Sequence, residues 1–99
     1  MEVPATSTSE VARIAEELLD RRRVAQARGV LGAALACNPR DVLLLLQSAR
    51  ADYLEDRYDS CRETLGRILQ SAPTHFGARW LLLVVLIEEG MLEIGRAHV

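Results

Sequence analysis

Apolar residues recur along most of the chain at the three- and four-residue spacing of amphipathic helices. This pattern predicts no strand and five helices, which we expect over about 8–19, 24–37, 41–54, 58–71 and 75–89. Ser7 and Asp41 stand where N-cap residues of the first and third helices should be. Pro39 and Pro73 should end the second and fourth helices, and Gly90 should end the fifth.

The same arrangement returns with a period of 34 residues. The offset relates Pro39 to Pro73, Ala15 to Ala49, Ala27 to Cys61, Leu31 to Leu65, Gly32 to Gly66 and Leu35 to Leu69. Each unit is a pair of amphipathic helices followed by a proline, and such a pair must stack on a neighbour to bury its apolar face. The third helix is apolar on more than one face, which favours a position in the middle of the stack.

These units resemble tetratricopeptide repeats over about residues 8–92. That family has a 34-residue period and small residues where the two helices of a unit cross, matched here by Ala15, Ala27, Ala49 and Cys61. It also has a large residue opening the second helix and a proline closing the unit, matched by Val24, Tyr58, Leu92, Pro39 and Pro73. Asp52 departs from the pattern, because the family often carries an aromatic residue there. Pentatricopeptide repeats, which bind RNA, are the nearest alternative, but their unit is slightly longer and this chain is not basic.

The resemblance implies an all-α fold, a right-handed α-solenoid of antiparallel helix pairs with about two and a half repeats. The expected organisation is a flexible lead over 1–7, repeats over 8–41 and 42–75, a partial repeat over 76–92 and a non-native tail over 93–99. The tail, Glu93 to Val99, resembles the in-frame translation of a sequencing adapter, so we interpret the chain as a fragment of a longer bacterial protein. The apolar face of residues 80–87 would then be a missing interface.

Composition and charge narrow the class of protein. The chain is 49% hydrophobic and 26% charged, as in ordinary globular domains, and its net charge of -2 argues against a nucleic-acid surface. Residues 1–9 lack the pattern of a signal peptide, and the apolar runs at 42–46 and 80–87 are far shorter than the ~20 residues of a membrane span. We therefore expect a cytoplasmic protein with no membrane span in this segment.

The chemistry-bearing residues form no recognisable catalytic or metal motif. Cys37 and Cys61 are interpreted as separate buried or half-buried thiols, and with His75 they lack the spacing of metal ligands. The acidic residues, Asp52 among them, are interpreted mostly as solvated helix ends. The basic run 21–23 is interpreted as solvated surface. The sequence therefore predicts no enzyme, no cofactor and no metal.

In tetratricopeptide repeats the first helix of each unit lines a concave surface. Carried over to this chain, the expected partner-binding residues are Leu43, Leu46, Arg50, Tyr53, Leu54, Trp80, Val84 and Ile87. The same surface would also include Ser9, Ala12, Glu16, Leu19, Asp20, Gly77 and Glu88. In the family's best-known ligand mode, Lys, Asn and Arg side chains bind the terminal carboxylate of a peptide. The matching positions here hold Ala12, Glu16, Gln47, Gly77 and Leu81, so these carboxylate-binding residues are missing.

The expected function is therefore a protein-interaction scaffold or adaptor that holds an apolar peptide or helix of a protein partner in this groove. An alternative is the regulatory or substrate-docking arm of a larger enzyme or signalling protein. A third possibility is self-association through the apolar third unit.

Overall fold

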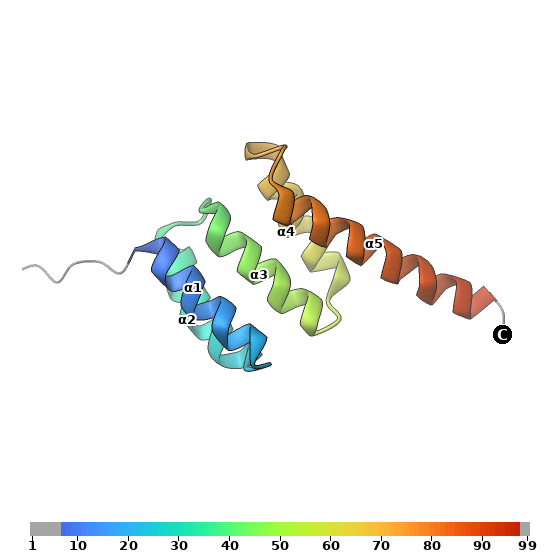
Figure 1. Ribbon diagram of the computed structural model, residues 1–99, viewed down its shortest axis with the longest axis horizontal. Coiled ribbons are helices and arrows are strands. Elements are labelled where there is room, and N and C mark those ends of the chain that lie inside the picture. Colours follow the sequence, from blue (N-terminus) through green and yellow to red (C-terminus); the bar gives the residue numbers. More distant parts are fainter. Residues whose placement is uncertain (1–6, 98–99) are drawn as a thin grey trace, which may run out of the picture.

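The computed structural model describes the backbone of residues 7–97 and the side chains of residues 7–91. It contains five α-helices, α1 (Thr8–Asp20), α2 (Val24–Cys37), α3 (Val42–Leu54), α4 (Tyr58–Ser71) and α5 (Phe76–Ala97), and no strand lies within the described backbone (Figure 1). The expected all-α class is confirmed, and the predicted bounds of the first four helices agree with the structure within two residues. The lead over 1–6 and the end of the tail at 98–99 lie outside the described residues.

The three first helices of the units begin with the same side-chain cap. Ser7, Asp41 and His75 stand 34 residues apart, and each side chain accepts a hydrogen bond from the backbone N–H three residues further on, at 3.1 to 3.2 Å. These bonds satisfy one of the free N–H groups that every helix start leaves open. The caps at Ser7 and Asp41 follow the prediction. The imidazole cap at His75 was not predicted, because histidine is not among the preferred N-cap residues.

The turns inside the two complete units are also the same. Arg22 and Asp56 adopt left-handed backbone conformations with φ of 60° and 59°. After Arg22, the N–H of Arg23 donates to the carbonyl oxygen of Leu18 at 2.8 Å. After Asp56, the N–H of Arg57 donates to the carbonyl oxygen of Asp52, also at 2.8 Å. This is the Schellman ending of a helix, which usually carries glycine at the left-handed position. The 34-residue period of the sequence therefore appears in the backbone geometry.

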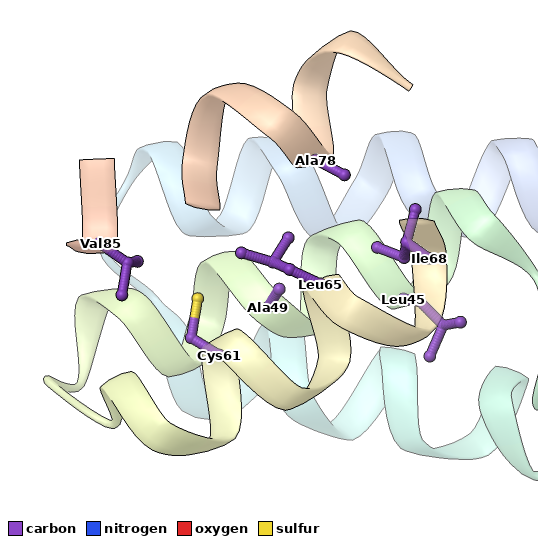
Figure 2. Close-up of a cluster of buried hydrophobic side chains, with 7 residues drawn as sticks. All are labelled: Leu45, Ala49, Cys61, Leu65, Ile68, Ala78 and Val85. Carbon is purple, nitrogen blue, oxygen red and sulfur yellow. The ribbon is translucent and has the colours of Figure 1, made fainter. Parts of the chain in front are cut away.

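Helix α3 lies in the middle of the packing, as the sequence predicted. It contacts α1, α2, α4 and α5. The contacts α1–α2, α1–α3 and α2–α3 recur one unit later as α3–α4, α3–α5 and α4–α5. The small residues predicted at the crossings, Ala15, Ala27, Ala49 and Cys61, are all fully buried. Figure 2 shows the largest core cluster, in which Ala49, Cys61 and Leu65 lie between the backbones of α3 and α4 while Val85 and Ala78 enter from α5.

One acidic residue contradicts the prediction of solvated helix ends. The Asp52 side chain is only 6% exposed and receives hydrogen bonds from Arg28 of α2 at 2.5 Å and from Ser60 of α4 at 2.8 Å. Arg28 also donates to Glu55 at 2.6 Å. A buried carboxylate is tolerated only when such partners replace its water. Asp52 therefore joins three helices where an aromatic residue was expected.

Helix α5 does not end at Gly90, and this prediction was wrong. The helix continues through Gly90 to Ala97, so no turn precedes Leu92 and no separate helix opens there. A glycine inside a helix costs about 1 kcal/mol relative to alanine but does not by itself end it. The following residues as far as Ala97 include good helix formers and no proline, so the helix has no reason to stop. In Figure 1 the last turns of α5 extend beyond the other helices.

The two cysteines lie in different surroundings. Both are free thiols, but Cys37 at the end of α2 is exposed while Cys61 is buried. The prediction of buried or half-buried thiols therefore holds for Cys61 and is wrong for Cys37. Burial, together with the negative charges of Asp52 and Glu89, raises the pKa of the Cys61 thiol to about 11. This thiol is consequently protonated near neutral pH and unsuited to nucleophilic chemistry.

Candidate binding groove

A groove of about 590 Å³ runs between α1, α3 and α5. Its lining comes from one face of each of these helices and comprises Glu16, Asp20, Arg22, Leu46, Gln47, Arg50, Tyr53, Leu54, Gly77, Trp80, Leu81 and Val84. Six of the partner-binding residues expected from the sequence are in it, namely Leu46, Arg50, Tyr53, Leu54, Trp80 and Val84. The other two, Leu43 and Ile87, are exposed but lie outside the lining, at 44% and 51% exposure.

The 34-residue offset also explains why these residues share a groove. Glu16, Arg50 and Val84 occupy one position of the repeat, and Leu46 and Trp80 occupy another. Equivalent positions on successive packed helices point the same way, so they form rows across α1, α3 and α5. Ala12 and Leu19 were expected on this surface but are buried at 6% and 0% exposure, because α3 packs directly over that part of α1.

The floor of the groove depends on a close approach of α5 to α3. A Cβ atom added to Gly77 would lie 3.2 Å from Leu46 Cδ2 and 3.2 Å from His75 Cε1. Glycine at this position therefore lets the first turn of α5 come down against α3. The aromatic side chain of Trp80, one turn further on, is 58% exposed and stands at the edge of the groove.

Three of the four charged residues in the groove lining, Arg50, Asp20 and Glu16, contact one another. Arg50 donates to Gln47 Oε1 at 2.9 Å and to Asp20 Oδ1 at 3.0 Å, and its guanidinium lies 3.9 Å from Glu16. The two acids are more than half exposed, so these pairs add little to stability. Their effect is to hold the Arg50 side chain across the floor between α1 and α3, where its charge is balanced by neighbouring carboxylates.

Tyr53 of the groove lining belongs to a cluster with Tyr58 and Glu88, which lie outside the lining. Tyr53 donates to Glu88 Oε1 at 2.6 Å and Tyr58 donates to Glu88 Oε2 at 2.8 Å, while the two rings lie 6.0 Å apart. The hydrogen bond to the Glu88 carboxylate, with a smaller effect of burial, raises the pKa of both phenols above the ordinary value. Glu88 thus ties α5 to α3 and α4. The sequence analysis placed Tyr53 and Glu88 on the same surface but gave no sign of this contact.

The groove combines apolar side chains with four charged ones, of which Arg50, Asp20 and Glu16 contact one another. Among the described residues, no group of three His, Cys, Asp or Glu side chains is placed to hold a metal ion. None of the described helices combines the length and the apolar character that crossing a membrane requires. Comparisons with protein-family models, curated proteins and solved structures found no match.

Proposed function

We propose that the chain is part of a tetratricopeptide-type right-handed solenoid that acts as an interaction scaffold, with the groove between α1, α3 and α5 as its binding site. The observation that carries this proposal is the origin of the lining, most of which comes from repeated positions of three successive first helices. Glu16, Arg50 and Val84 share one position, and three further positions contribute pairs, namely Asp20 with Leu54, Leu46 with Trp80, and Gln47 with Leu81. The recurrence of the caps, of the Schellman turns and of the helix contacts with the same 34-residue offset supports the repeat type.

The chemistry of the groove favours an apolar segment of a protein partner, either helical or extended. Leu46, Leu54, Leu81 and Val84 provide the apolar part of the lining, hereafter the apolar strip, and Trp80 stands at its edge. A volume of about 590 Å³ is within the range of sites that hold several side chains. Arg50 already contacts Asp20, so we expect the ligand to be recognised mainly by its apolar side chains, with Arg22 as the second cation of the lining.

A peptide-selection experiment tests this proposal. Random peptides displayed on phage are selected against the folded protein, and binding of the selected peptides is then followed by the fluorescence of Trp80, the single tryptophan of the chain. We expect binding to shift the emission to shorter wavelength because a covered indole leaves water. Val84→Glu places a charge in the apolar strip and should weaken binding by at least about tenfold.

Leu43→Glu is the matched control, since Leu43 is an exposed leucine of α3 outside the groove. It should leave the affinity unchanged. The proposal fails if no selected peptide depends on Val84, or if Leu43→Glu abolishes binding while Val84→Glu does not. Circular dichroism on both variants establishes that each is folded.

A further inference from the structure

The outer side of α5 carries an uncovered row of large apolar residues. Phe76, Trp80, Leu83, Ile87 and Met91 follow one another at spacings of three and four, so they form one stripe, hereafter the outer strip. Their exposure ranges from 49% at Leu83 to 79% at Phe76. The buried residues Ala78 and Val85 lie on the opposite side of the helix and face α3 and α4. Figure 1 shows α5 at the edge of the molecule, with the other helices on one side of it.

At two positions of the outer strip, Leu83 and Ile87, equivalent residues of the earlier first helices are fully buried. Leu83 stands at the repeat position of Ala15 and Ala49, both of which are fully buried by the helix pair that follows them. Ile87 stands at the position of Leu19, which is also fully buried, and of Tyr53, which lines the groove. The outer strip therefore includes positions that this architecture uses for packing, and at Leu83 it carries a larger side chain than the alanines at the equivalent positions.

We propose that the outer strip is the interface of a symmetric dimer of this chain, in which α5 packs against α5 of a second copy. Its five side chains expose on the order of 600 Å² together, close to the ~800 Å² that each partner contributes to a stable interface of standard size. Besides the outer strip, the large apolar side chains exposed among the described residues are Leu43 and Leu86. Leu86 lies beside the strip, so among the described residues of a second copy it is α5 that offers an apolar surface of matching size.

The shape of the strip favours an antiparallel crossing near Leu83. Phe76 and Gly90 stand seven residues before and after Leu83, so this crossing places the Phe76 ring of one copy over Gly90 of the other. Space above Gly90 is open, because a Cβ added there meets nothing within 4 Å. A parallel pairing would instead bring the two Phe76 rings together and leave the two glycines facing a gap. Antiparallel pairing by a two-fold axis also closes the assembly at two copies.

Sedimentation velocity of the full chain, from low to high micromolar concentration, tests the dimer. We expect a dimer that Phe76→Glu converts to a folded monomer. A glutamate at the first position of α5 suits the helix N-terminus, so the variant should fold, while two added charges at the contact should raise the dissociation constant by about 100-fold. Leu43→Glu, also in the first turn of a helix, is the control and should remain dimeric. A monomeric wild-type chain, or a Phe76→Glu variant that still dimerises, overturns the proposal.

Single cysteines test the orientation in a Cys37→Ser background, which removes the exposed native thiol. Under mild oxidation, Leu83→Cys should form a disulfide between copies because it lies at the two-fold axis, and Phe76→Cys should not. Self-linkage of Phe76→Cys overturns the antiparallel arrangement. Trp80 belongs to both the groove lining and the outer strip, so peptide binding is measured on the monomeric Phe76→Glu variant, in which dimer formation does not change the surroundings of Trp80.

Discussion

The buried carboxylate of Asp52 is the polar group on which the packing of α2, α3 and α4 should depend most. Its side chain is 6% exposed and accepts hydrogen bonds from Arg28 and Ser60. Partial burial lowers the pKa of Arg28, but the hydrogen bonds and charges of Asp52 and Glu55 outweigh that effect and raise it above the ordinary value. Asp52→Ala removes the acceptor that both donors share and leaves a cavity between three helices.

The expected loss follows from the exposure of the two partners. Breaking a fully buried ion pair costs about 3–5 kcal/mol, because the remaining charge is left without a partner. Arg28 is 32% exposed and keeps its bond to Glu55, so losing its pair with Asp52 costs less free energy than breaking a fully buried pair. We therefore expect Asp52→Ala to lower the free energy of unfolding by about 2 kcal/mol. With a urea dependence of about 1.5 kcal/mol per molar for a chain of this size, the unfolding midpoint should fall by about 1.3 M.

Urea unfolding followed by far-ultraviolet circular dichroism measures this shift. Asp59→Ala is the matched control, because Asp59 is 92% exposed and pairs only with Arg62 on its own helix, so its loss should cost less than about 0.5 kcal/mol. A double-mutant cycle with Arg28→Ala should give a coupling of about 1 kcal/mol or more. Equal effects of Asp52→Ala and Asp59→Ala, or a coupling near zero, would refute the assignment of Asp52 as a buried joint between helices.

Three further predictions concern the tyrosine pair and the helix ends. In an alkaline absorbance titration, both tyrosines of the chain should ionise above their ordinary pKa, and Glu88→Gln should lower their pKa values towards it. The stabilisation from this pair is complete below about pH 10 and is lost as the pH rises further, because the phenols lose their protons at a higher pH in the folded than in the unfolded state. Arg22→Gly should raise the unfolding free energy by roughly 0.5–1 kcal/mol in urea titrations by relieving a left-handed non-glycine residue, whereas glycine at the helical position Arg67 should lower it by about as much. Thermal unfolding should show that His75→Ala costs about 1 kcal/mol and that His75→Asp does not, because aspartate keeps the cap acceptor.

The sequence determined the helices well because their signals are local. The apolar spacing, the caps at Ser7 and Asp41 and the prolines at 39 and 73 each act within a few residues, and the structure confirms them. The prediction failed at Gly90, because one glycine was taken as the end of α5 although the residues after it favour a helix. A stop signal is reliable when proline or a satisfied turn accompanies it, as at Asp56, whose left-handed turn precedes α4 without any glycine.

The groove was predicted in part for the same reason. The resemblance placed the first helix of each unit on the concave surface, and the repeat offset carried the positions along, so Leu46, Arg50, Trp80 and Val84 could be named without coordinates. The exposure of each residue could not be predicted, because it depends on how closely neighbouring helices approach one another. Ala12 and Leu19 share the pattern and are buried under α3.

The polar contacts between units carried a signal in the sequence that the pattern of apolar residues hid. Arg28 donates to Glu55 at 2.6 Å across the boundary between the first and second units. The pair recurs 34 residues later, where the guanidinium of Arg62 lies 3.0 Å from Glu89. A charged pair that repeats with the period of the apolar core fixes the register of each second helix against the first helix of the next unit. The repeat therefore consists of apolar and charged positions together. The offset applied to charges picks out Arg28 and Glu55, whose equivalents are Arg62 and Glu89, but it gives no signal for Asp52, whose equivalents are Leu18 and Leu86.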